Sequence, residues 1–258
     1  MQEIKIVFFD VDGTLVDMQR GQSSAATVET LLRLKQRGIK ICIATGRPIV
    51  CLPKLPGVEF DVYLTFNGSY CYDASGTIFS NPISPEDAQK VIENAAAIGR
   101  PVSVATRDRL VANGYDQDLA DYYALAHNTL TVAEDFYEVC RDPIYQIMLG
   151  CREADHPHIL AQTKAVRITT AWERAADVIP AKGSKGLGVQ KILDHYGISK
   201  SQAMAFGDGN NDIEMLQAVG TGIAMGNATP NLKSVANHIC APVWQEGIYH
   251  YCMEQGLI

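Results

Sequence analysis

The sequence predicts an α/β fold in which a doubly wound parallel sheet is interrupted by an inserted α+β module. Apolar runs without alternation, such as residues 6–9, are typical of strands buried on both faces of a parallel sheet. Runs in the middle of the chain instead alternate apolar with polar residues, which is typical of an antiparallel sheet with one wet face. The two patterns together indicate two kinds of sheet in one chain.

The first third of the chain predicts a βαβ unit. After the strand at 6–9, apolar residues recur at helical spacing over 25–38, and Gly38 is a suitable cap for the end of that helix. The residues at this spacing are Val28, Leu31, Leu32 and Leu34. A second apolar strand follows over 39–48, and a third over 61–70 contains a turn at Asn67-Gly68.

The alternating runs lie within residues 82–182, a length usual for a domain. A helix is expected over 84–99, with Ser84 as its N-cap and Pro85 in its first turn. The expected strands are 100–106, 109–114, 143–150 and 165–172. Because the buried-strand pattern returns in the last third, residues 1–81 and 183–258 are predicted to form one domain and 82–182 to be inserted into it.

The composition excludes several classes of protein. The chain has 258 residues, a formal net charge of −7 and no long run of like charge, which argues against a nucleic-acid surface. Apolar stretches are shorter than the roughly 18 residues that a membrane span needs. The charged residues among 1–5 leave no room for a signal peptide before the first strand, so none is expected.

Seven cysteines are scattered without a Cys-x-x-Cys pair. An odd, irregular set of this kind suits reduced thiols in a cytoplasmic protein better than a disulfide framework.

Two aspartates follow the first strand directly. Asp10 and Asp12 are expected to leave the sheet on the same side at its carboxyl end, the edge at which open α/β sheets bind ligands. A turn before Gly13 would need only one of them. Two neighbouring like charges are unfavourable unless a proton or a cation relieves them, so a divalent metal is the first expectation.

Three further polar clusters follow strand-like runs and are expected at the same edge. Each has a structural alternative: Thr45-Gly46 as a turn, Lys185 as a solvated side chain, and Asp208 or Asp212 as helix caps. Together they supply carboxylates, a hydroxyl beside a glycine, and one lysine, which favours a site over chance turns.

These motifs resemble the haloacid dehalogenase superfamily of phosphatases, within it the Cof-type, subclass IIB, sugar-phosphatase-like branch. The stretches that carry the resemblance are D-x-D-G-T-L at 10–15, T-G-R-P at 45–48, P-x-x-x-S-K-G at 180–186 and G-D-G-N-N-D at 207–212. The resemblance implies a Rossmann-like core, a cap domain at 82–182 that sets substrate specificity, and hydrolysis of small phosphomonoesters such as hexose phosphates.

The resemblance also implies a role for each motif residue. Asp10 is the nucleophile that forms an aspartyl-phosphate, and Asp12 is the general acid and base. Mg²⁺ is held by the Asp10 carboxylate, the Asp12 backbone carbonyl and the Asp208 carboxylate, with Asp212 orienting metal-bound water or pairing with Lys185. The phosphoryl group is bound by Thr45, Gly46, Lys185 and Asn211.

Other residues have two interpretations. Polar and aromatic groups near strand ends of the cap either recognise substrate hydroxyls or are solvated: Arg107, Arg109, Trp172, Glu173 and Arg174. His156 and His158 are expected to lie in a loop or helix start rather than to bind a metal. Residues 222–228 are expected to form a strand and turn rather than a phosphate cradle.

Rival functions are a sugar phosphomutase and an aspartyl-phosphate signalling module, against which the D-x-D spacing and the inserted cap argue. A catalytically silent sugar-phosphate binder is disfavoured because every motif residue is present. The expected partner is a small phosphorylated metabolite, and the chain is expected to be a monomer or weak homo-oligomer.

Overall fold

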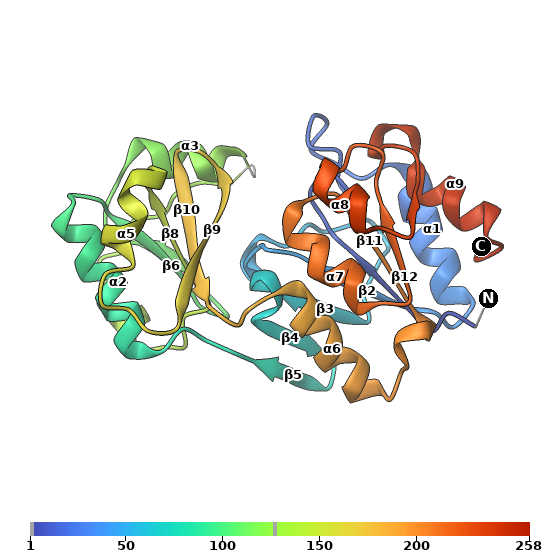
Figure 1. The fold of residues 1–258 in the computed structure, drawn as a ribbon, viewed down its shortest axis with the longest axis horizontal. Helices are drawn as coiled ribbons and strands as arrows, with labels where there is room; N and C mark the ends of the chain where they lie inside the picture. Colours follow the sequence, from blue (N-terminus) through green and yellow to red (C-terminus); the bar gives the residue numbers. More distant parts are fainter. Residues whose placement is uncertain (1–2, 126–127) are drawn as a thin grey trace. The chain divides into compact units, whose positions relative to one another are not determined.

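The computed structural model describes residues 3–125 and 128–258, and the chain divides into two compact units. The first unit comprises Met1–Gly46, Pro53–Ser80 and Ser184–Ile258. The second comprises Arg47–Leu52 and Asn81–Gly183. Figure 1 traces the course of the chain through their elements.

The first unit is built on an eight-stranded sheet with the order β13-β12-β11-β1-β2-β3-β4-β5. Its six strands from β13 to β3 run parallel, whereas β4 and β5 form an antiparallel hairpin at one edge. The strands are β1 (Ile6–Phe9), β2 (Lys40–Ala44), β3 (Val62–Thr65), β4 (Tyr70–Asp73), β5 (Gly76–Ser80), β11 (Ala203–Gly207), β12 (Thr221–Ala224) and β13 (His238–Ile239). The predicted α/β class is therefore confirmed, with a hairpin that the sequence did not indicate.

Helices cover both faces of this sheet, as a doubly wound fold requires (Figure 1). The helices of the first unit are α1 (Ala25–Gln36), α6 (Lys185–Tyr196), α7 (Ile213–Ala218), α8 (Pro230–Val235) and α9 (Gly247–Glu254). Helix α1 contacts β2 and α9, while α6 contacts β3 and α7. The central strands are consequently buried on both sides, and all four residues of β1 are inaccessible to solvent.

Helix α1 confirms the predicted helix but not its whole apolar face. Leu31 and Leu34 are fully buried, whereas Leu32 is exposed. The remaining buried positions are Thr27 and Thr30, and the Thr30 hydroxyl donates a hydrogen bond to the Ala26 carbonyl within the helix. A threonine that satisfies its hydroxyl locally packs in place of the expected leucine.

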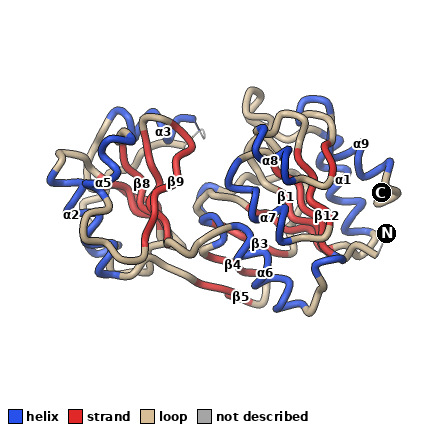
Figure 2. The backbone as a smooth tube through the Cα atoms, viewed as in Figure 1, coloured by secondary structure: helices blue, strands red, loops and turns tan. Residues whose placement is uncertain are grey.

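The second unit is built on a five-stranded antiparallel sheet with the order β7-β6-β8-β10-β9. Its strands are β6 (Val102–Ala105), β7 (Leu110–Ala112), β8 (Gln146–Gly150), β9 (Val166–Trp172) and β10 (Ala175–Pro180). Its helices are α2 (Pro85–Ala97), α3 (Gln117–Leu125), α4 (Phe136–Val139) and α5 (His156–Ile159). The Ser84 hydroxyl accepts the Asp87 N–H at the start of α2, as predicted for an N-cap. Figure 2 shows the helices and strands of each unit.

The sequence analysis missed one strand of this sheet and was wrong about its wet face. Strand β10, which pairs with both β8 and β9, was not predicted. The expected wet face is absent from β6 and β8 in the described chain, since all their residues are buried, as are those of β10. An apolar cluster with α2 covers one face, and α3 packs against β8 and β10.

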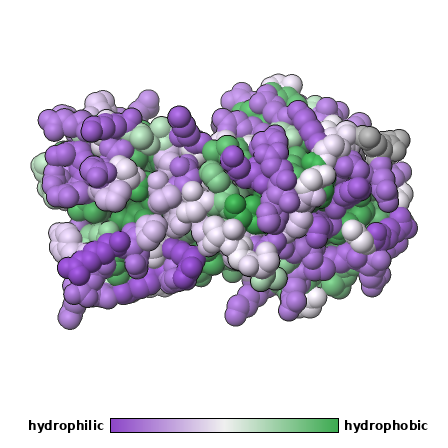
Figure 3. Space-filling view, turned by 90° about the horizontal axis from the view of Figure 1, so that it is seen from below, coloured by the Kyte–Doolittle hydropathy of each residue, from purple (hydrophilic) through white to green (hydrophobic). Residues whose placement is uncertain are grey.

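The face of the molecule in Figure 3 is largely hydrophilic, with small apolar areas between the polar side chains. Within residues 3–125 and 128–258, the helices are too short or too polar to cross a membrane.

Candidate active site

Strands β1, β2, β3 and β11 end at the same edge of the large sheet. Their parallel register pairs Phe9 with Ile43 and with Phe206, so the residues that follow each strand lie close together. The Phe9 and Phe206 rings stack with centroids 5.4 Å apart, which fixes the two adjacent strand ends. Asp10 and Asp208 follow directly after these two strands.

Lys185 joins two carboxylates at this edge. Its Nζ lies 2.6 Å from Asp10 Oδ1 and 2.6 Å from Asp212 Oδ1. The side chain of Lys185 is fully buried, so the solvated alternative for this lysine is wrong. Burial alone would lower the pKa of Lys185, but the charges of Asp10 and Asp212 outweigh it and raise the pKa above its ordinary value.

Helix α6 brings Lys185 to this position. The helix begins at Lys185, and the hydroxyl of its N-cap Ser184 accepts the Leu187 N–H. Gly68 lies against this turn, because a Cβ on it would stand 2.1 Å from the Ser184 carbonyl oxygen. The lysine is therefore held by its helix start and by the loop after β3.

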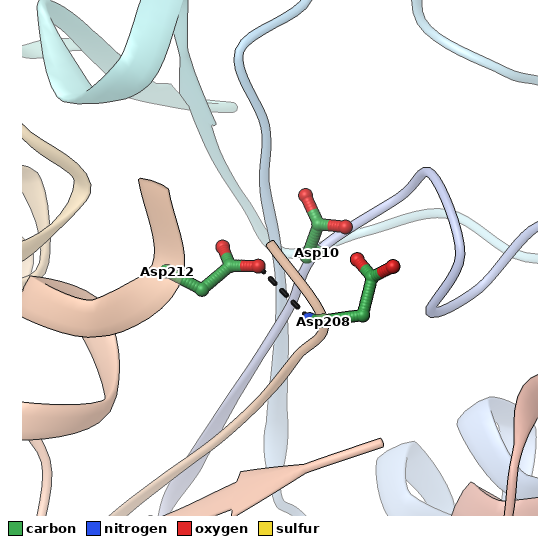
Figure 4. A group of neighbouring side chains, drawn as sticks. All are labelled: Asp10, Asp208 and Asp212. Carbon is green, nitrogen blue, oxygen red and sulfur yellow. Dashed lines mark hydrogen bonds between the residues drawn. The ribbon is translucent and has the colours of Figure 1, made fainter. Parts of the chain in front are cut away.

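Asp10, Asp208 and Asp212 form a cluster suited to a metal ion. One carboxylate oxygen of each lies within 4.8 Å of those of the others, and Figure 4 shows the three side chains converging. Asp212 Oδ2 also accepts the backbone N–H groups of Asp208 and Gly209, both at 3.0 Å. The two carboxylate oxygens of Asp212 therefore accept hydrogen bonds from Lys185 and from the backbone. Asp10 and Asp208 are the members of the cluster better placed to give a carboxylate oxygen to a metal ion.

The electrostatics of the cluster fit a bound cation. Burial raises the pKa of Asp10 well above its ordinary value, and Asp212 and Asp208 add to the rise while Lys185 opposes it. Burial and the Asp212 charge raise the pKa of Asp208 to about 7. A divalent cation would relieve both effects, and carboxylate oxygens are the ligands that Mg²⁺ prefers. The residues present therefore fit the expected metal.

Asp12 lies in the turn after β1 and is half-buried. Its backbone forms an isolated bridge with Val16. Its charge contributes to the raised pKa values of Asp10 and Asp208, which places it near both. Its carboxylate is not part of the three-residue cluster found in the described chain, so it differs from Asp10 in its surroundings.

Thr45, Gly46 and Asn211 lie around Asn67, which was predicted to form a turn but was not assigned to the site. Thr45 is buried, and its carbonyl accepts the Asn67 N–H at 3.0 Å. Asn211 Nδ2 donates to Asn67 Oδ1 at 3.1 Å. A Cβ on Gly46 would lie 3.0 Å from the Asn67 amide. Asn67 thus links the loops after β2, β3 and β11.

The loop that carries Asn67 has an unusual backbone. Phe66, Asn67 and Gly68 have successive φ angles of 51°, 52° and 86°. Positive φ is unfavourable for an aromatic residue and persists where surrounding structure imposes it, often at functional sites. The predicted turn at Asn67-Gly68 is correct, but the sequence alone does not show that it belongs to the site.

Asn227 is a second residue that the sequence interpretation did not assign to the site. It follows β12, whose strand and turn confirm the expectation for 222–228. Its Nδ2 donates to the Gly13 carbonyl at 2.8 Å and to Asp208 Oδ2 at 3.2 Å, and its Oδ1 accepts the Val243 N–H. Asn227 therefore orients Asp208 from the turn after β12, a strand that carries none of the predicted site residues.

The candidate residues of the second unit are engaged in local contacts. Arg109 pairs with Asp135, and the Arg174 guanidinium lies 4.4 Å from the Trp172 ring centroid. Glu173 is exposed. Arg107 pairs with Asp108.

His156 and His158 lie in the short helix α5, in agreement with the expected helix start. Neither belongs to a group of three potential metal ligands within the described residues.

Comparison with known proteins agrees with this geometry. The profile of the haloacid dehalogenase-like hydrolases matches residues 7–252. The putative phosphatase YkrA of Bacillus subtilis (strain 168) is 30% identical over 98% of both chains. The 5-amino-6-(5-phospho-D-ribitylamino)uracil phosphatase YitU of the same organism is 27% identical over 96% of both.

A solved structure described as the subclass IIB sugar phosphatase BT4131 has a TM-score of 0.87 and 29% identity, covering 98% of this chain and all of that one. The match extends through both units. The chain therefore belongs to the haloacid dehalogenase-like hydrolase family and is an enzyme of its phosphatase branch.

Proposed function

We propose that this phosphatase hydrolyses small phosphomonoesters through an aspartyl-phosphate on Asp10. The observation that supports this most directly is the buried ion triplet in which Lys185 contacts Asp10 and Asp212. An ionised nucleophile beside a fixed positive charge is suited to attack on an anionic phosphate, because the charge that develops on the phosphoryl oxygens is offset. Attack by Asp10 splits hydrolysis into two easier steps.

Asp12 is proposed to protonate the leaving alkoxide and then to take a proton from the attacking water. It lies two residues after Asp10 and near it, yet outside the acidic cluster. A carboxylate that is not a side-chain metal ligand can give up and take up a proton in the two half-reactions.

Mg²⁺ is the proposed cofactor, held by the carboxylates of Asp10 and Asp208 and by the Asp12 backbone carbonyl. When bound, it supplies positive charge to the phosphoryl oxygens. Asp212 is proposed to position these ligands without binding the metal itself. Its contacts with Lys185 and with the Asp208 N–H support this role.

Phosphoryl oxygens are proposed to bind the Thr45 hydroxyl, the Gly46 N–H, Lys185 and Asn211. Support comes from the convergence of the loops that carry them and from the shared contact with Asn67. Because a Cβ at position 46 would lie 3.0 Å from the Asn67 amide, glycine allows the loops after β2 and β3 to approach closely there.

The substrates are proposed to be sugar phosphates or related phosphorylated metabolites, with the module at 82–182 acting as a specificity cap. The name of BT4131 as a sugar phosphatase and that of YitU, which acts on a ribityl phosphate, favour this class. Action in a reducing cytoplasm is consistent with seven free cysteines.

A panel of phosphoesters, assayed for phosphate release with and without Mg²⁺, tests the proposal. We expect turnover of several sugar phosphates with Mg²⁺, none with excess chelator, and none by an Asp10→Asn variant. An Asp61→Asn variant, altered just before the start of β3, at the opposite end of that strand from the site, serves as the control and should retain turnover. Full activity in chelator would contradict the metal assignment, and activity of Asp10→Asn would contradict the nucleophile.

A further inference from the structure

The turn after β12 brings a side chain to the same edge of the large sheet as the proposed metal ligands. Strand β11 lies between β12 and β1 in this sheet, and the three strands are parallel. Asp208 follows β11, Gly13 lies in the turn after β1, and Asn227 follows β12. The Asn227 side chain contacts the other two residues, so it connects the ends of three neighbouring strands.

Two backbone groups fix the orientation of the Asn227 amide. Its Oδ1 accepts the Val243 N–H at 2.9 Å, and its Nδ2 donates to the Gly13 carbonyl at 2.8 Å. If the oxygen and nitrogen of the amide were exchanged, both hydrogen bonds would be lost, because a carbonyl cannot donate and an N–H cannot accept. Nδ2 carries two hydrogens, and it also donates to Asp208 Oδ2 at 3.2 Å.

The two backbone partners of the Asn227 amide are held by their own surroundings. The Gly13 N–H donates to the Val16 carbonyl at 2.9 Å, which closes the turn after β1 on itself. Val243 is the first residue of a short 3-10 helix. The Asp208 carboxylate, in contrast, can rotate about its side-chain bonds. The amide is therefore anchored on the backbone and acts on Asp208.

Backbone hydrogen bonds on either side of Asn227 hold its turn in place without the side chain. The Met225 N–H donates to the Gly207 carbonyl, and the Thr229 N–H donates to the Asp208 carbonyl, both at 2.9 Å. Loss of the Asn227 side chain should therefore leave the turn beside the end of β11 and release only the Asp208 carboxylate.

We propose that Asn227 is a positioning residue for the metal site, which holds the Asp208 carboxylate in the orientation that binds Mg²⁺. This inference rests on the proposed function, because Mg²⁺ and its ligand Asp208 belong to that proposal. A carboxylate that is already held loses less conformational freedom when it binds a metal, so removal of the group that holds it weakens binding. Asn227 is not itself a ligand, since its oxygen is used by the Val243 N–H.

Calorimetric titration with Mg²⁺ alone tests this role without turnover. The Kd for Mg²⁺ should rise about tenfold in Asn227→Ala, as is typical when a residue that orients a metal ligand is removed. Asn227→Leu should show a similar rise, because leucine fills the space of the asparagine but has no N–H to donate. A wild-type Kd in both variants would overturn the proposal.

Asn237→Ala is the matched control. Asn237 Oδ1 accepts the Gly222 N–H at 2.7 Å, so this variant also loses a hydrogen bond between an asparagine side chain and the backbone. Gly222 lies near the start of β12, whereas Asn227 follows the end of that strand. The Kd for Mg²⁺ should therefore stay within about twofold of wild type in Asn237→Ala. Equal rises in Asn237→Ala and Asn227→Ala would overturn the proposal, because they would reflect a general loss of stability.

The Mg²⁺ dependence of turnover separates positioning from wider damage to the site. In Asn227→Ala, the Mg²⁺ concentration needed for half-maximal activity should rise about tenfold, and kcat at saturating Mg²⁺ should return close to the wild-type value. A kcat that saturating Mg²⁺ does not restore would overturn the positioning role, because the loss would not lie in metal binding.

Metal binding and turnover can fail independently. A wild-type protein that binds Mg²⁺ but hydrolyses none of the phosphoesters would overturn the proposed function, while a weaker Mg²⁺ affinity in both Asn227 variants would still support the positioning role. An active wild-type protein whose Mg²⁺ affinity is unchanged by both substitutions would overturn the positioning role alone.

Discussion

The ammonium group of Lys185 lies 2.6 Å from the carboxylate of Asp10, and the lysine is completely buried. A buried charge pair contributes little net stability, but the loss of one partner leaves an uncompensated charge that is strongly unfavourable. Because Asp212 makes an equally short contact, Lys185 neutralises two carboxylates rather than one.

We expect Lys185→Met to lower the free energy of unfolding by about 3–5 kcal/mol and to abolish turnover. Urea denaturation and phosphate release measure the two effects. Lys191→Met is the control, since Lys191 lies on the same helix but is exposed, with its Nζ 5.6 Å from the Phe79 ring centroid. An unchanged free energy of unfolding in Lys185→Met would mean that Asp10, Lys185 and Asp212 are not all ionised in the folded protein.

We expect a substitution at Gly13 to lower activity by displacing a neighbouring side chain. Its φ angle is 82°, and a Cβ there would lie 2.2 Å from Asp208 Oδ2. Gly13→Ala should therefore displace the Asp208 carboxylate and lower kcat about 10²-fold, because small displacements of a catalytic group have effects of this size. Steady-state kinetics measure it.

The Gly38→Ala variant separates the effect of backbone strain from the effect of displacing the Asp208 carboxylate. Gly38 has a similar φ angle of 76°, but nothing lies within 4 Å of a Cβ there. Both variants should lose about 1–2 kcal/mol of stability from the left-handed backbone. Only Gly13→Ala should lose activity, and comparable kinetics in the two would argue against the steric explanation.

The positions of the first-unit motifs could be predicted because strand ends in a parallel sheet share an edge. An apolar run that stops at Asp10 or Asp208 indicates both the strand and its end, so separation in sequence does not matter. Asn67 and Asn227 were not predicted as site residues, since an asparagine after a strand is equally typical of any turn. Their contacts depend on loops from other strands, and no local pattern encodes those.

The second unit was predicted less well for a related reason. Ser103 and Gln146 give their strands the alternation of a wet face, but both are buried, as is Asp177 on the strand that was not predicted. Ser103 bonds the Tyr123 hydroxyl on α3, and Asp177 bonds Tyr122 on the same helix. Polar residues that hydrogen-bond to a packed helix have the same sequence pattern as solvated ones.

Asp208 is expected to be the residue on which metal affinity depends most directly. Asp208→Asn keeps the size of the side chain but removes a charge, so the Mg²⁺ concentration needed for half-maximal activity should rise at least about tenfold. A Mg²⁺ titration of phosphate release measures it. Asp194→Asn, on α6 at an exposed position, should leave the titration unchanged. An unchanged titration for Asp208→Asn would place the metal elsewhere.

Asp12 should be separable from Asp10 by the choice of leaving group. In Asp12→Ala the alkoxide of a sugar phosphate lacks its proton donor, and turnover should fall about 10²- to 10⁴-fold. The phenolate of an aryl phosphate leaves unassisted, so a burst of phenolate followed by slow hydrolysis is expected in rapid-mixing experiments. Equal slowing of both substrates without a burst would show that Asp12 is a structural or metal-binding residue only.

Asp177 should make stability depend on pH in a direction opposite to that of most acidic residues. Its pKa rises from an ordinary value of 3.8 to about 6 in the folded protein. Between these pH values the folded state binds more protons than the unfolded state, so the free energy of unfolding falls as pH rises. The contribution present below pH 3.8 is lost by about pH 6, and a shift of this size corresponds to at most about 3 kcal/mol.

Asp177→Asn removes this titration. The stability of the variant relative to wild type should therefore increase between pH 5 and pH 8, as measured by urea denaturation at each pH. Asp73→Asn is the comparator: burial opposes, but hydrogen bonds from Ser75 and Tyr196 outweigh it, and the pKa of Asp73 is lowered to about 2. Because both relevant pKa values of Asp73 lie below 4, its relative stability should be constant from pH 5 to pH 8. Parallel profiles for the two variants would show that the pKa of Asp177 is not raised in the folded protein.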